Sequence, residues 1–189
     1  MHKLIRLTIS LSTVAAAALT LTLPLSAQAP SGLMADLLKD LASVEKKLME
    51  LAKVMPESAW TWRPAGDAAV RSTGEVFQHI AADNYLLPVL GGAQAPAETG
   101  ITKDYKTAQA YEKKTMSREA TLAELQKSFA FLRSSMSASE SKLDAPIEMF
   151  GQKNTTRGLW IATLTHLHEH MGQLIAYARS NKVTPPWSK

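Results

Sequence analysis

Cysteine is absent from the 189 residues of the chain. Disulfide bonds, thiolate zinc sites, iron–sulfur clusters and cysteine nucleophiles are therefore excluded. A lipoprotein anchor is excluded as well, because there is no cysteine to acylate. Any metal site in this protein must be built from histidine, aspartate or glutamate.

Charge of either sign is also sparse, since only 20% of the residues are charged and 21 Lys and Arg stand against 17 Asp and Glu. The formal net charge of +4 is small, and no basic cluster alternates with aromatic residues as a nucleic-acid-binding channel requires. We therefore expect no nucleic-acid partner.

Apolar residues, by contrast, are abundant enough for one compact core, at 46% of the chain. This length and composition are typical of a single globular domain, and nine glycines and nine prolines are too few for a low-complexity or collagen-like chain.

The first 29 residues have the pattern of a secretory signal peptide. Lys3 and Arg6 precede an uncharged run over 7–25, and Ala27 and Ala29 are the small residues that a signal peptidase reads. We expect cleavage before Pro30, although proline after the cut is unfavourable, and a domain over 30–189. The protein is then periplasmic or secreted, without a membrane span. The alternative is an uncleaved anchor, because the run approaches the about 20 residues of a spanning helix.

Four long segments follow helical periodicity and predict an all-α four-helix bundle without strands. They cover residues 32–54, 73–90, 117–136 and 155–180, with a shorter helical piece over 107–115. Ser72 and Glu75 form a capping box at the start of the second segment, and Pro88 predicts a kink or an early end of that segment. Asn181 is expected to terminate the fourth segment in a left-handed conformation. Trp60 and Trp62, in the connection over 57–71, are expected to close one end of the core. The connections over 91–105 and 138–154 are expected to shape the mouth of a pocket.

The histidines carry the main functional signal. His166 and His170 lie about 40° apart around one helix, at about 100° per residue, so both imidazoles can bind one ion. His79, on the second segment, is the remaining histidine that can supply a third ligand. His168 lies about 200° from His166, and we interpret it as a packed or interface histidine. Imidazole suits zinc, nickel, copper and iron alike.

Acidic and polar residues accompany the histidines. Asp83, four residues after His79, is a rival ligand or an acceptor that fixes an imidazole tautomer. Glu169, Gln173 and Tyr177 share the face of the His166–His170 pair. Glu169 and Asp83 are the candidate catalytic proton shuttles, and Gln173 and Tyr177 are weaker candidates for stabilising developing charge.

Three blocks of the chain resemble the DinB-like/YfiT-like superfamily of metal-binding four-helix bundles, which is distinct from the DNA polymerase of similar name. They are MPESAWTWRP over 55–64, RSTGEVFQHIAADNY over 71–85 and HLHEHMGQLIAYAR over 166–179. The resemblance implies a three-histidine site for zinc, nickel or a similar divalent ion at His79, His166 and His170. It also implies a frequent homodimer and either hydrolase or thiol-dependent transferase or isomerase activity.

Three functions stay open from the sequence. The first is hydrolysis of an unknown small-molecule substrate by water that the metal activates. The second is metal-dependent thiol transfer, which export disfavours because low-molecular-weight thiols are cytosolic. The third is a non-catalytic envelope protein in which the ion joins two helices.

Overall fold

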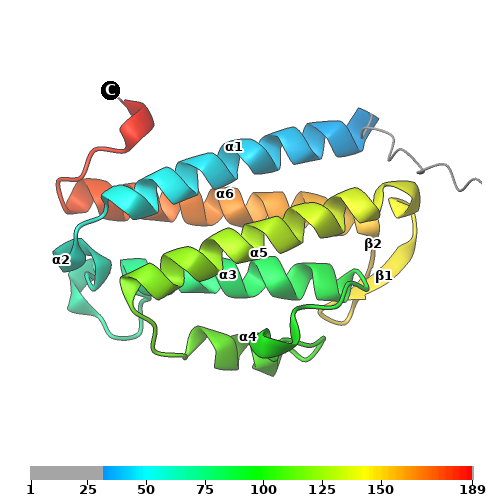
Figure 1. Cartoon of the computed structure of the whole chain (residues 1–189), viewed down its shortest axis with the longest axis horizontal. Helices are drawn as coiled ribbons and strands as arrows, with labels where there is room; N and C mark the ends of the chain where they lie inside the picture. Colours follow the sequence, from blue (N-terminus) through cyan, green and yellow to red (C-terminus); the bar gives the residue numbers. More distant parts are fainter. Residues whose placement is uncertain (1–31, 189) are drawn as a thin grey trace, which may run out of the picture.

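The computed structural model describes residues 32–188, so the predicted signal peptide lies outside the described residues. Four long helices form a bundle (Figure 1), and a two-stranded hairpin and two shorter helices complete the described part of the chain. The long helices are α1 (Gly32–Val54), α3 (Thr73–Leu90), α5 (Arg118–Ala138) and α6 (Thr156–Ser180). The short ones are α2 (Glu57–Trp60) and α4 (Tyr105–Glu112). The predicted all-α bundle is confirmed, and the limits of the four long helices lie within about two residues of the expected ones. The shorter helical piece predicted over 107–115 corresponds to α4, which starts and ends earlier.

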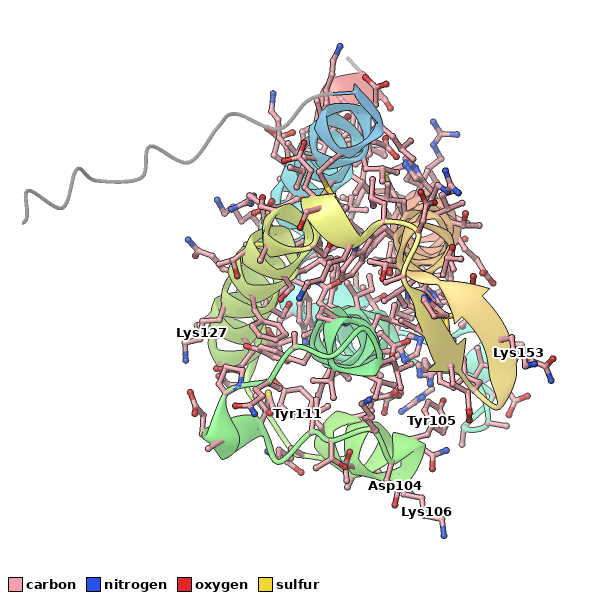
Figure 2. The ribbon with its side chains drawn as sticks, turned by 90° about the vertical axis from the view of Figure 1, so that its right-hand side faces the viewer. Asp104, Tyr105, Lys106, Tyr111, Lys127 and Lys153 are labelled. Atoms are coloured by element: carbon pink, nitrogen blue, oxygen red, sulfur yellow. The ribbon has the colours of Figure 1, made fainter. Side chains whose placement is uncertain are left out.

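The bundle is square in section, because α1 and α3 occupy opposite corners and each packs against both α5 and α6. On the side of α3 that faces away from α1 lies α4, which packs against α3 (Figure 2). As a result α3 is covered from three directions and 17 of its 18 residues are buried, all except Glu75. A helix in that position can carry polar residues into the interior only if they find partners there.

The start of α3 follows the predicted capping chemistry. The Ser72 hydroxyl accepts from the Glu75 backbone N–H, and the Glu75 carboxylate accepts from the Ser72 backbone N–H. Gly74 allows Trp60 to approach, because a Cβ there would lie 2.3 Å from the indole Nε1. Trp60 in turn stacks on Phe77, with ring centroids 5.2 Å apart. The expected closure of one end of the core by a tryptophan is therefore present.

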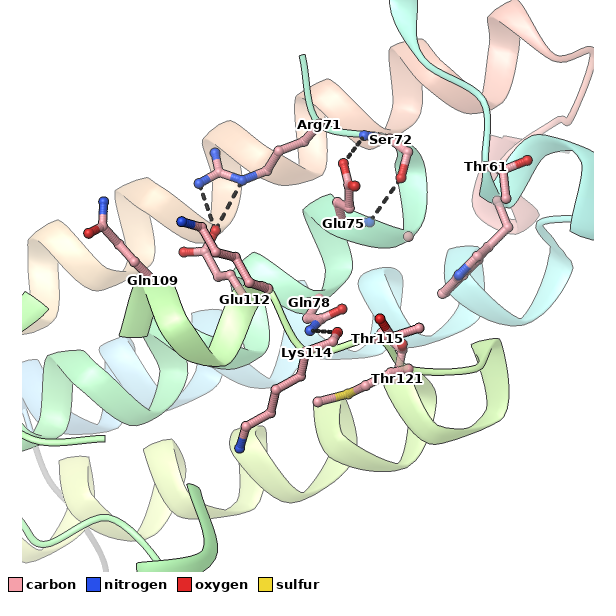
Figure 3. Close-up of a pocket in the computed structure, with 14 residues that line it drawn as sticks. Thr61, Arg71, Ser72, Glu75, Gln78, Gln109, Glu112, Lys114, Thr115 and Thr121 are labelled. Atoms are coloured by element: carbon pink, nitrogen blue, oxygen red, sulfur yellow. Dashed lines mark hydrogen bonds and ion pairs between the residues drawn. The ribbon is translucent and has the colours of Figure 1, made fainter. Parts of the chain in front are cut away.

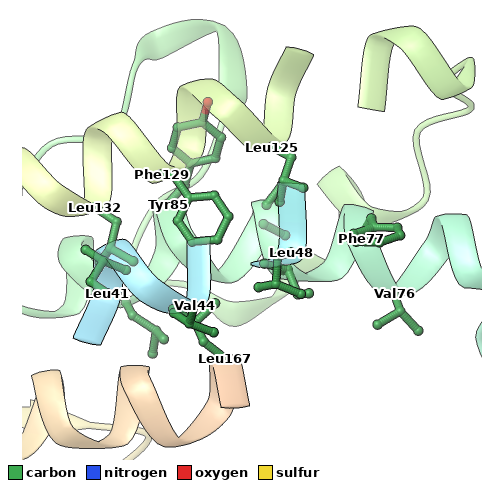
Figure 4. Packing of buried hydrophobic residues seen from close by; sticks show 14 of the residues in the cluster. Leu41, Val44, Leu48, Val76, Phe77, Tyr85, Leu125, Phe129, Leu132 and Leu167 are labelled. Carbon is green, nitrogen blue, oxygen red and sulfur yellow. The ribbon is translucent and has the colours of Figure 1, made fainter. Parts of the chain in front are cut away.

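The core between the four helices is continuous and apolar (Figure 4). Leu41, Val44 and Leu48 of α1 meet residues of α5 such as Leu125 and Phe129. Each of these five side chains is at most 1% exposed. Such burial of leucine-sized groups contributes about 1.5–3 kcal/mol per side chain before the entropy of folding is subtracted. No helix within 32–188 has both the length and the apolar character needed to span a membrane.

Three local expectations were wrong. Residues 138–154 are more than a connection, because β1 (Pro146–Met149) and β2 (Gln152–Thr155) pair antiparallel, with Met149 opposite Gln152. Pro88 does not end α3, which continues to Leu90. The left-handed residue after α6 is Lys182, at φ 60°, and not Asn181.

The hairpin turn contains an unfavourable residue. Phe150 and Gly151 join the strands with φ values of 51° and 76°, and positive φ at both positions is what a type I′ turn requires. Asn-Gly is the usual pair there, because a bulky side chain in the left-handed region costs roughly 1–2 kcal/mol. The turn therefore keeps phenylalanine at an energetic cost.

Candidate metal centre

Three histidines from two helices converge between α3 and α6. Nε2 of His166 lies 3.1 Å from Nε2 of His79 and 3.0 Å from Nε2 of His170. The three rings stand nearly perpendicular to one another, with interplanar angles of 69–87°. His79 is buried and the other two are partly buried. The structure thus brings together the three residues that the spacing singled out.

The separations fit a single divalent ion. Imidazole nitrogens bound to zinc at about 2.0–2.1 Å in tetrahedral geometry stand about 3.3 Å apart. The observed separations of 3.0 and 3.1 Å are close to that value and need only small side-chain adjustments. The donor set of His79, His166 and His170 is therefore sterically able to hold such an ion.

Hydrogen bonds at Nδ1 of His79 and His170 leave Nε2 of each ring available to bind a metal ion. Nδ1 of His79 lies 2.7 Å from Oε1 of Glu112, and Nδ1 of His170 lies 2.8 Å from Oε1 of Gln173. Both oxygens are acceptors, so each Nδ1 carries a proton and each neutral ring presents an unprotonated Nε2. Two lone pairs then face a common point, which a cation stabilises.

The carboxylate of Asp83 lies beside the three histidine nitrogens. Its Oδ2 lies 3.1 Å from Nε2 of His166 and 3.6 Å from Nε2 of His79. Its Oδ1 is buried and has no hydrogen-bond partner within residues 32–188. A buried carboxylate oxygen without a partner is costly, and a bound cation or water would supply one. The two alternatives for Asp83, ligand and acceptor, both fit this position.

The protonation of the site favours metal binding. Burial lowers the pKa of His170 to about 4, and it outweighs the hydrogen bond with Gln173, which raises this pKa. The ring is therefore neutral at physiological pH, and only a neutral imidazole can donate its lone pair to an ion.

Glu112 is a functional residue that the sequence did not reveal. Burial would raise its pKa, but the hydrogen bond from His79, together with the hydrogen bond and charge of Arg71, lowers it below the usual value. Arg71 donates to Oε2 of the same carboxylate at 2.8 Å. Glu112 therefore stays ionised behind His79, as in the carboxylate–histidine–metal arrangement.

The remaining candidates lie farther from the three nitrogens. Gln173 accepts from His170 and donates to the Tyr177 hydroxyl at 2.9 Å, so both residues hold the back of the ring rather than facing developing charge. The side chain of Glu169 is exposed and makes no hydrogen bond to another residue within 32–188. Its catalytic role stays a prediction. His168 faces α1, where it pairs with Asp40 at 3.0 Å.

Two clefts lie between α3 and α4. One, of about 600 Å³, lies beside Glu112 and Arg71, between the first turn of α3 and the end of α4 (Figure 3). The other, of about 580 Å³, lies between the end of α3, the start of α4 and the hairpin, and Tyr105 and Phe150 line it. The second cleft is formed by the two connections expected to shape a pocket mouth. The histidines line neither cleft themselves.

Fold and site together define a class: a square helical bundle with a three-histidine centre between two of its helices. The sequence profile of the DinB superfamily matches residues 40–174. The chain belongs to the DinB superfamily.

A solved structure has the same fold. A DinB-like protein of Bacillus cereus superposes with a TM-score of 0.64 at 16% identity, over 79% of this chain and 93% of that one. A DinB-like protein of Bacillus subtilis gives a TM-score of 0.49 at 23% identity, with the same coverage. No curated protein matches the sequence.

Proposed function

We propose that the protein binds a zinc or nickel ion through His79, His166 and His170 and hydrolyses a small-molecule substrate with water that the ion activates. The observation that carries the proposal is the convergence of three Nε2 atoms, with Asp83 beside them and no cysteine available. When bound by three neutral imidazoles, such an ion lowers the pKa of a water ligand to about 7.

The surrounding residues supply the other requirements of a hydrolase. Asp83, whose Oδ1 is unpaired in the described part of the chain, is the group best placed to accept a proton next to the histidines. Glu112 and Gln173 fix the tautomers of His79 and His170 from behind. Glu169 is the second proton shuttle that we propose, on the exposed side of α6.

The test is elemental analysis of the purified protein followed by turnover on panels of esters, amides and phosphoesters. We expect about one divalent ion per chain, and hydrolysis that chelation removes and zinc or nickel restores. The same panels with added low-molecular-weight thiols test thiol transfer, because turnover that appears only with thiol would replace the hydrolase proposal.

The position of Asp83 also favours a second candidate, a non-catalytic metal site. Because Oδ2 lies 3.1 Å from Nε2 of His166, this carboxylate could become a fourth protein ligand and leave no position for water. The ion would then join α3 and α6 and stabilise the fold. The electronic spectrum of the cobalt-substituted protein distinguishes the two, since an open site changes its spectrum when acetohydroxamate is added and a closed site does not.

We further propose that the protein acts after export, by way of the signal-like residues 1–29, and that it forms a homodimer. The mass of the protein isolated from cells would show whether cleavage occurs before Pro30. Light scattering at several concentrations would measure the oligomeric state.

A further inference from the structure

The hairpin turn combines two features that folding alone does not favour. Phe150 has a φ of 51°, in the left-handed region that bulky residues avoid. The residue is 57% exposed, although a phenylalanine gains stability by burial. Asparagine at this position would remove both costs. A strained, exposed aromatic residue of this kind is a reason to look for a ligand.

The ring of Phe150 faces a second exposed aromatic residue. Tyr105, at the start of α4, is 41% exposed, and its ring meets that of Phe150 edge to face with centroids 5.9 Å apart. Figure 2 shows Tyr105 between α4 and the hairpin. Both rings line the 580 Å³ cleft, together with Leu90 and Ile147. The cleft therefore offers two aromatic surfaces and an aliphatic wall.

This cleft is linked to the metal centre by two helices. Tyr105 begins α4, and Glu112, which holds His79, ends it. Along α3, the seven residues from Asp83 to Leu90 rise about 10 Å at 1.5 Å per residue. A molecule that reaches from the histidines to the cleft must therefore be elongated.

The charges at the rim do not select an ion of one sign. Lys103 stands against Asp104 and Glu148 among the lining residues. The aromatic and aliphatic surfaces are thus the distinguishing chemistry of this cleft, and they suit an aromatic ring.

We infer that the substrate is an elongated small molecule with an aromatic ring at the end away from its reacting group, and that Tyr105 and Phe150 bind this ring. This inference rests on the proposed function, because it assumes that the reacting group lies at the histidines. The hairpin thereby determines substrate specificity, while α3 and α6 supply the chemistry.

The experiment compares hydroxamates, which bind an open metal site through one end. Binding of acetohydroxamate, hexanohydroxamate and 4-phenylbutanohydroxamate to the zinc-loaded protein is measured by calorimetry. We expect the phenyl compound to bind about tenfold more tightly than the hexanoyl compound, as an aromatic contact beyond simple burial allows.

Two substitutions at the turn make the comparison specific. Phe150→Asn suits the type I′ turn, so the melting temperature should not fall, yet the tenfold preference for the phenyl compound should disappear. Phe150→Trp keeps an aromatic ring and should retain the preference. Equal binding of the phenyl and hexanoyl compounds, or an unchanged preference in Phe150→Asn, would overturn the inference alone. Failure of acetohydroxamate to bind the zinc-loaded protein would overturn the open metal site, and the inference with it.

Discussion

His168 and His170 lie two residues apart on α6 and have different surroundings. His170 turns toward His79 of α3, and its neighbours on α6 are Gln173, which holds Nδ1, and His166, whose Nε2 lies 3.0 Å from that of His170. His168 turns toward α1 and pairs with Asp40, and both of those side chains are more than 40% exposed. The same residue type therefore belongs to a buried polar centre on one face of the helix and to a surface ion pair on the other. The helical face, and not the residue type, decides the role.

The largest difference between the two histidines should appear in metal content. We expect His170→Ala to weaken zinc binding by more than about 100-fold, the upper end of the effect for groups that only support a ligand. Two imidazoles would remain where three are needed. His168→Ala should keep its zinc, since this residue lies on the opposite face. Elemental analysis after zinc loading and desalting measures both, and a fully loaded His170→Ala protein would refute the site.

The next effect concerns the support of His79. Glu112→Gln keeps the size of the side chain but removes the charge behind the imidazole, so zinc affinity should fall about 10–100-fold. The matched control is Glu119→Gln, an exposed acid in the first turn of α5. Competition against a chromophoric chelator gives the affinities. Equal affinities in the two variants would mean that Glu112 does not support the site.

The pH dependence of stability should also differ between substitutions of His170 and His168, which lie on opposite faces of α6. The pKa of His170 in the folded, metal-free protein is about 4, below the ordinary value of 6.5. Between these pH values the unfolded chain binds a proton at this residue and the folded chain does not, so acid favours unfolding. We expect the free energy of unfolding to fall as the pH is lowered from 6.5 to 4.

His170→Gln removes the titrating group from that experiment. Its slope of stability against pH should be shallower, whereas His168→Ala should retain the steeper slope. Urea titrations of the metal-free proteins at several pH values give the slopes. Identical slopes for His170→Gln and the unsubstituted protein would show that His170 is not responsible.

The smallest effect is expected from removing the exposed ion pair between His168 and Asp40. His168→Ala should cost less than about 1 kcal/mol of stability, because solvent and salt screen a pair of half-exposed groups. Urea unfolding at pH 6, in low and in high salt, measures the cost. A loss above about 2 kcal/mol would place His168 among residues whose packing matters and would weaken the contrast with His170.

The long helices were predictable because their signals are local. Ser72 and Glu75 mark the start of α3, and the apolar residues of α1 repeat every three or four positions. The hairpin was missed because four residues per strand are too few for a clear alternation. Phe150 also concealed the turn, since a phenylalanine stands where asparagine is usual.

The candidate site was predictable in part for the same reason. Helix geometry places His166 and His170 together, and His79 was then the remaining histidine. Glu112 could not be found in this way, because its contact with His79 exists only when α4 packs against α3. The roles of Gln173 and Tyr177 depend likewise on the direction in which the His170 ring turns.

The helices, the absence of thiol chemistry and the shared face of His166 and His170 follow from composition and from the fixed 3.6-residue turn, so the amino-acid sequence specifies them directly. That His79 meets this pair, that Asp83 lies beside it and that Glu112 supports it depends on how the helices pack. The contacts of His79 with Glu112 and with His166 join residues 33 and 87 positions apart. Their distances are set by how the apolar faces of several helices pack together, which no local pattern of residues specifies.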